Sequence, residues 1–131
     1  MNQEEEKNLI DNIINDFYEK AKGDFLIGYH FRHIKNFDDH IPKIQRFWHL
    51  ILLELSKEEQ KAYIQEGIPN NIIEAHQYLK IKPGEVGRWI VLFKQVQAQY
   101  KNLNNQSLIQ KWEKKINQFE KIFLSSKILF P

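Results

Sequence analysis

The chain has no cysteine among its 131 residues, and this absence excludes several kinds of chemistry. Disulfide bonds, thiolate nucleophiles and cysteine-based zinc sites all need the thiol group. The five glycines stand apart, so no glycine-rich phosphate loop is present. The His-Glu-x-x-His signature of zinc proteases, the Glu-x-x-His pairs of di-iron bundles and the serine nucleophile elbow are missing too.

Strong charge and long apolar runs are also lacking. The net charge is only +2 and the lysines are spread along the chain, which argues against nucleic acid as a partner. The longest apolar runs, "LILL" and "WIVLF", are far too short to cross a membrane. The first residues, "MNQEEEKN", are acidic and polar, unlike a secretory signal. We therefore expect a single cytoplasmic domain over residues 1–131, without membrane insertion.

The sequence is rich in helical periodicity. Apolar residues recur at helical spacing over residues 9–21, after an acidic first turn, and Gly23 is the expected end of this helix. A second helix is expected to start at Asp38 or Asp39 as N-cap, with Pro42 tolerated in its first turn. Between the two, we expect a corner of short turns.

A capping box predicts the next helix. "SKEE", from Ser56 to Glu59, opens a short helix that ends near Gly67. Pro83 and Gly84 are expected to break the chain. The remaining apolar stripes predict three more helices, over residues 69–80, 86–100 and 108–123. No segment alternates with period two for long enough to form a strand, so the predicted class is all-α.

A histidine stands within an apolar stripe in "IIEAHQYLKI", residues 72–81. His76 shares its helical face with Ile72 and Leu79. One interpretation is a core histidine whose ring nitrogens bond to the backbone. The other is a neutral imidazole that points at a buried group which needs its lone pair.

The other polar rings differ in how well they suit a surface or a core. His30 and His33 could chelate a metal, but they lie in an expected loop without a third ligand, so we predict a solvated pair. His49 lies off the apolar stripe and is predicted to be on the surface. Tyr18 and His40 carry polar atoms on apolar faces, and several such residues around a common space suggest a polar ligand.

Four segments, taken in order, resemble one known family. The segments "FYEKAKGDFLIGYHF", "DDHIPKIQRFW", "EAHQYLKI" and "GRWIVLF" follow those of the truncated hemoglobins, specifically the third group, through nearly the whole chain. The lack of a Gly-Gly pair fits this group. The chain departs from the family in its longer segment between Trp48 and His76, and in Pro42, which follows His40 closely.

The resemblance implies a 2-on-2 α-helical sandwich of about six helices around a pocket for heme b. His76 matches the proximal histidine, which holds the heme iron. Phe31 matches the phenylalanine that packs on the heme, and Tyr18, Trp89 and His40 match the distal residues that stabilise the ligand. The predicted wall of the pocket adds Phe47, Ile72 and Leu79.

From this we expect a globin that reversibly binds dioxygen, NO or CO at a five-coordinate iron, rather than an enzyme. Donors beside a ligand that carries partial negative charge retain it, because charge-assisted hydrogen bonds are strong. Two alternatives stay open. The first is a heme enzyme of the same fold, a nitric oxide dioxygenase or a peroxidase, which needs a separate reductase. The second is an interaction module without heme, whose aromatic residues are simply core.

Overall fold

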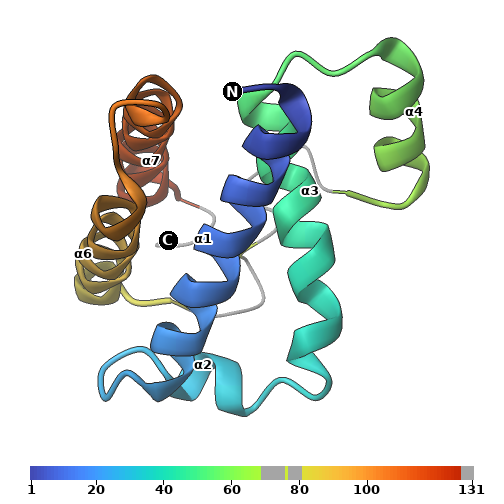
Figure 1. Cartoon of the computed structure of the whole chain (residues 1–131). Helices are drawn as coiled ribbons and strands as arrows, with labels where there is room; N and C mark the ends of the chain where they lie inside the picture. Colours follow the sequence, from blue (N-terminus) through green and yellow to red (C-terminus); the bar gives the residue numbers. More distant parts are fainter. Residues whose placement is uncertain (69–75, 77–80, 128–131) are drawn as a thin grey trace.

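A long N-terminal helix organises the chain in the computed structural model, which describes residues 1–68, 76 and 81–127 (Figure 1). Helix α1 (Gln3–Gly23) begins with a capping box between Asn2 and Glu5 and ends at Gly23, as predicted. Its acidic first turn complements the helix dipole. One face is buried, formed by Ile10, Ile13, Ile14, Phe17, Tyr18 and Ala21.

The other described elements are helical as well. They are α2 (Tyr29–Arg32), the 3-10 helix η1 (Phe37–His40), α3 (Ile41–Leu52), α4 (Lys57–Gln65), α6 (Pro83–Tyr100) and α7 (Gln106–Ser125). The described part of the chain contains no strand, and the all-α prediction is confirmed. The helix expected over residues 69–80 lies outside the described residues, apart from His76.

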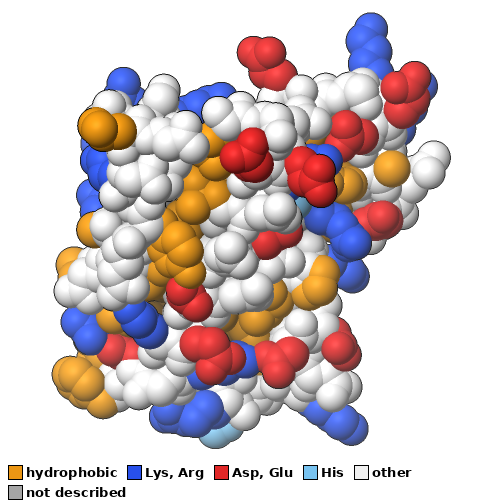
Figure 2. All heavy atoms as spheres, viewed as in Figure 1, with side chains coloured by type: hydrophobic (Ala, Val, Ile, Leu, Met, Phe, Trp, Pro, Cys, Tyr) orange, Lys and Arg blue, Asp and Glu red, His pale blue; other side chains and the backbone are white. Residues whose placement is uncertain are grey.

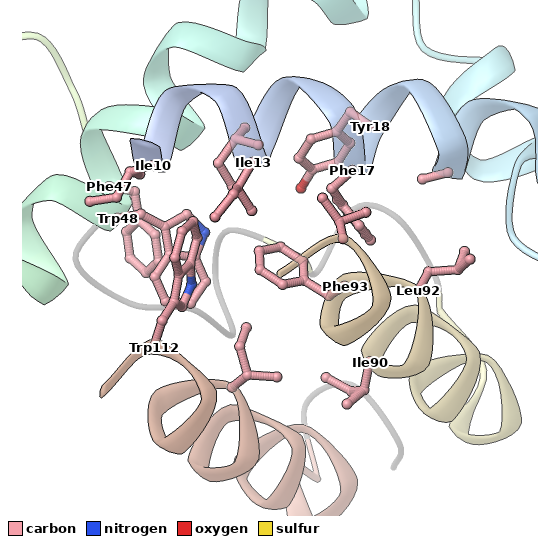
Figure 3. Packing of buried hydrophobic residues seen from close by; sticks show 14 of the residues in the cluster. Ile10, Ile13, Phe17, Tyr18, Phe47, Trp48, Ile90, Leu92, Phe93 and Trp112 are labelled. Atoms are coloured by element: carbon pink, nitrogen blue, oxygen red, sulfur yellow. The ribbon is translucent and has the colours of Figure 1, made fainter. Parts of the chain in front are cut away.

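Helix α1 contacts α3 and α6, and α6 in turn contacts α7 (Figure 1). The core between them is rich in aromatic rings. Trp48 of α3 and Trp112 of α7 lie 5.3 Å apart by ring centroids, and Phe93 of α6 contacts both (Figure 3). Phe17 of α1 completes the group, with its ring 4.6 Å from that of Phe93. The burial of these large rings is the main force that holds the four long helices together.

Helix α4 stands at the edge of the molecule (Figure 1) and buries none of its residues. Ser56 caps its first turn by accepting a hydrogen bond from the Glu59 amide, as the sequence predicted. Polar contacts attach it to its neighbours: Lys7 pairs with Glu59 at 2.6 Å, and Arg46 pairs with Glu66 at 3.0 Å.

The corner after α1 turns sharply at Gly28. A Cβ atom there would come within 2.4 Å of the Asp24 carbonyl oxygen and 2.6 Å of the Lys22 carbonyl oxygen, so no larger residue fits. Beyond the corner, the sequence predicted an aspartate cap for α3, but Asp38 and Asp39 belong to η1 instead. Pro42 does lie in the first turn of α3, where its missing amide hydrogen is tolerated.

The expected break at Pro83 and Gly84 is not a break. Both residues form the first turn of α6, and Glu85 closes this turn by accepting a hydrogen bond from the Lys82 amide at 2.8 Å. Proline suits the first turn because the amide it lacks would have no partner within the helix. The two residues that were expected to break the chain are therefore the first residues of a helix.

On the face shown in Figure 2, charged side chains of both signs are interspersed, and lysines and arginines do not gather into one patch. None of the described helices is long and apolar enough to cross a bilayer.

Candidate functional site

Five aromatic or imidazole rings from separate segments form a continuous cluster. Tyr18 of α1 contacts Phe31 of α2, with ring centroids 5.5 Å apart and an interplanar angle of 82°. Phe31 contacts Trp89 of α6 at 5.2 Å, and Trp89 contacts His76 at 5.7 Å. The His76 ring also lies 5.1 Å from that of Phe123 in α7. We call these five residues the ring cluster.

Tyr18 brings a phenol group into the molecular interior. Only 5% of its surface is exposed, and its ring also packs edge-on against Phe17. Figure 3 shows its oxygen pointing away from the α1 ribbon and towards the side on which Phe93 lies. Hydrogen bonds are stronger in such surroundings than in water, because the local dielectric constant is low.

His76 is half-buried, and its ring makes T-shaped contacts with the rings of Trp89 and Phe123. The neutral form of an imidazole is the form that binds a metal. Ile72 and Leu79, predicted to line the same site, lie outside the described residues.

Two other predicted site residues have no recorded ring contact with a member of the ring cluster. Phe47 is buried between α3 and α7, where its ring contacts Trp48 at 5.3 Å and Phe119 at 6.2 Å. His40 is exposed at the end of η1, and its ring lies 6.2 Å from that of Phe37. In this conformation Phe47 is a core residue, and the His40 imidazole faces solvent.

The predicted surface pair of histidines is wrong for one of its members. His33 is exposed, but His30 is buried, and its Nε2 lies 3.0 Å from Oε2 of Glu85. The Tyr29 hydroxyl donates to the same carboxylate oxygen at 2.6 Å. Sequence reasoning missed this site because Glu85 comes from the first turn of a helix far along the chain. We call Tyr29, His30 and Glu85 the corner cluster.

The electrostatics of the corner cluster follow from its hydrogen bonds. Burial raises the pKa of Glu85, but donation from Tyr29, from the Lys82 amide and from His30 outweighs burial, so the net pKa lies below the ordinary value. An ionised carboxylate only accepts, so Nε2 of His30 carries the hydrogen. The bond to Glu85 in turn raises the pKa of the Tyr29 phenol.

A second buried carboxylate ties the same corner to α6. Asp24 accepts two hydrogen bonds from the Arg88 guanidinium, at 2.6 and 3.1 Å, and two from the amides of Leu26 and Ile27. The bond from Arg88 lowers the pKa of Asp24 most, and the amide bonds lower it further, against the effect of burial. Glu85 and Arg88 thus join the start of α6 to the corner next to the ring cluster.

His49 was predicted to be a surface residue, and this prediction is wrong. Only 5% of it is exposed; its Nε2 lies 2.8 Å from Oδ1 of Asp11, and its Nδ1 lies 3.2 Å from the Tyr63 hydroxyl. The residue lies at the edge of the apolar face of α3, where α1 and α4 cover it. The imidazole connects three helices and is remote from the ring cluster by every contact recorded for it.

The described residues include no group of three or more carboxylate and imidazole side chains that could hold a free metal ion. A heme iron, by contrast, needs only one or two side-chain ligands, because the porphyrin supplies the others. Comparisons with protein-family models, curated proteins and solved structures gave no match for this chain. The side chains and their contacts are therefore the basis for inferring the function.

Proposed function

We propose that the protein is a heme-binding globin of the truncated-hemoglobin type, which binds dioxygen and other diatomic ligands reversibly. The observation that carries this proposal is the ring cluster. Tyr18, Phe31, His76 and Trp89 come from four separate segments, yet their rings form one chain of contacts. The resemblance assigned all four residues to one heme site, and it did so from the sequence alone.

The side chains of the ring cluster are of the kinds that heme needs. Heme b needs a neutral imidazole as iron ligand and a wall of apolar and aromatic groups for the porphyrin. His76 is half-buried between two aromatic rings and supplies the imidazole. Phe31, Trp89 and Phe123 supply aromatic faces. When bound, heme supplies a ferrous iron to which dioxygen, NO or CO attaches reversibly.

The protein itself determines how long a ligand stays. A donor beside the iron would hold a ligand that carries partial negative charge by a charge-assisted hydrogen bond. In this proposal the buried Tyr18 hydroxyl is the principal donor, and the Trp89 indole N–H is the second. The His40 ring is exposed and is not assigned a donor role.

The test is a hemin titration of the purified protein, with His76→Ala as the decisive variant and His33→Ala as its matched control. Hemin should give a Soret band at one equivalent in the wild type and in His33→Ala, because His33 is an exposed histidine. In His76→Ala the ferrous spectrum should change, and added imidazole should restore it, because imidazole replaces the missing ligand.

Each outcome of the titration has a distinct meaning. Absence of a Soret band in the wild type would overturn the proposal and favour the interaction module. A wild-type spectrum in His76→Ala would assign the iron to another histidine. Consumption of nitric oxide or peroxide by the hemin-loaded protein with an added reductase would support the heme enzyme instead of a ligand-binding globin.

A further inference from the structure

A buried carboxylate joins the two segments that carry Phe31 and Trp89 of the ring cluster. Glu85 is 6% exposed and accepts hydrogen bonds from Tyr29 and His30 on one oxygen and from the Lys82 amide on the other. These three bonds are directed at the corner and at the start of its own helix. Neither His30 nor Glu85 is among the residues proposed above to hold heme.

The covalent chain places each end of this contact beside a cluster ring. His30 directly precedes Phe31 in α2, and Glu85 precedes Trp89 by four residues, one turn earlier on the same face of α6. The hydrogen bond between His30 and Glu85 therefore lies next to the contact between Phe31 and Trp89, whose ring centroids are 5.2 Å apart with an interplanar angle of 65°. Both contacts join α2 to α6.

Helix α2 depends on such an anchor. It has only four residues and no side-chain cap at its N-terminus, and one turn of helix is unstable alone because its nucleation is costly. The bond between Asp24 and Arg88 holds the chain at the start of the corner, before Gly28. Only the corner cluster holds α2 itself to α6 through side-chain hydrogen bonds among the described residues.

We propose that Glu85 is a positioning residue: through Tyr29 and His30 it fixes Phe31 edge-on against Trp89 and thereby sets the geometry of the ring cluster. The effect on bound ligands rests on the proposed heme function. The effect on Trp89 does not, because it follows from protein contacts alone. These two consequences allow separate tests.

The first test is fluorine NMR of the purified protein labelled with 5-fluorotryptophan. The chain has three tryptophans, so the spectrum has three resonances, and Trp89→Phe assigns the one of interest. In E85Q the Trp89 resonance should move or broaden while those of Trp48 and Trp112 stay in place. General loosening of the fold would instead move all three and would overturn the proposal, as would an unchanged Trp89 resonance.

Four further variants give the result its specificity. His30→Gln keeps a side-chain N–H donor and should retain a Trp89 resonance close to that of the wild type, whereas His30→Leu should shift it as E85Q does. Should E85Q fail to fold, Tyr29→Phe removes a single hydrogen bond at a half-buried residue and should move the same resonance. His49→Gln removes the other buried histidine–carboxylate contact and should leave Trp89 unchanged.

The second test uses the hemin-loaded protein. Dioxygen should dissociate about two- to tenfold faster from E85Q and His30→Leu than from the wild type, the range that corresponds to loss of an aromatic pair. A shift of the Trp89 resonance in E85Q, without a Soret band in the wild type, would overturn the globin proposal and support the positioning role of Glu85. E85Q could instead bind heme normally and leave both dioxygen dissociation and the Trp89 resonance unchanged. That result would overturn the positioning role of Glu85 and support the globin proposal.

Discussion

Tyr18 carries a polar group on a ring that is only 5% exposed. The ring is packed by Phe17, Phe31 and Phe37. In the proposed heme site, its hydroxyl would donate a hydrogen bond to the bound ligand.

We expect Tyr18→Phe to speed dioxygen dissociation from the hemin-loaded protein by roughly 10- to 150-fold, since a hydrogen bond to a charged acceptor contributes about 1.5–3 kcal/mol. Carbon monoxide takes up less charge on ferrous heme, so its dissociation should change far less. Stopped-flow displacement of each ligand measures both rates.

The matched control is Tyr100→Phe, because the Tyr100 hydroxyl binds Asp16 and has no recorded contact with the ring cluster. This substitution should leave both dissociation rates as in the wild type. Equal acceleration of both ligands in Tyr18→Phe would indicate a wider pocket instead of a lost donor. No change for dioxygen would transfer the role to Trp89.

Single residues also show what local sequence patterns can and cannot predict. The Tyr18 and Trp89 rings each contact the Phe31 ring, and a shared ligand site for these three residues stays a prediction. His30 and His49 were predicted to be on the surface and are buried. Their partners, Glu85 and Asp11, lie 55 and 38 positions away, and such pairing has no local signal.

At the scale of elements, local rules predict most helix starts. Ser56 was read as a cap and accepts the Glu59 amide, because this motif involves only neighbouring residues. The expected cap at Asp38 or Asp39 failed because η1 takes up these residues before α3 begins. Phe37, the first residue of η1, is buried against Tyr18 and Phe31. That contact is tertiary and cannot be read locally.

Helix α4 should respond to loss of its cap independently of the rest. Ser56→Ala removes a hydrogen bond worth about 0.5–2 kcal/mol to the helix. Because α4 buries none of its residues, the loss should appear as faster amide exchange within Lys57–Gln65. The free energy of global unfolding should stay within about 0.5 kcal/mol of the wild type, as for other surface substitutions. Hydrogen exchange and urea unfolding measure the two effects, and a large loss of global stability would show that α4 is integral to the core.

At the scale of the molecule, the sequence predicted an all-α chain and the approximate extent of its helices, because helical periodicity records which face is buried. It could not predict which helices meet. Helix α1 contacts both α3 and α6, and two buried carboxylates, Asp24 and Glu85, secure the corner to α6. These acids make the stability of the whole fold depend on pH.

Acid should destabilise the protein through Asp24 in a defined range. Its pKa is lowered, so its contribution is fully present above the ordinary value of about 3.9 and is lost as the pH falls through the lowered value in the folded state. Asp24→Asn breaks the ion pair with Arg88 and should cost about 1.5–3 kcal/mol at pH 7. Urea unfolding should show that this difference shrinks below pH ~4, because the wild type then loses the same charge.

Asp38→Asn is the control. The Asp38 side chain is 79% exposed in its ion pair with Lys22, so this substitution should cost less than about 1 kcal/mol at either pH. A difference for Asp24→Asn that is the same at pH 7 and pH 3 would mean that its charge does not stabilise the corner, and that shape and the amide hydrogen bonds are sufficient there.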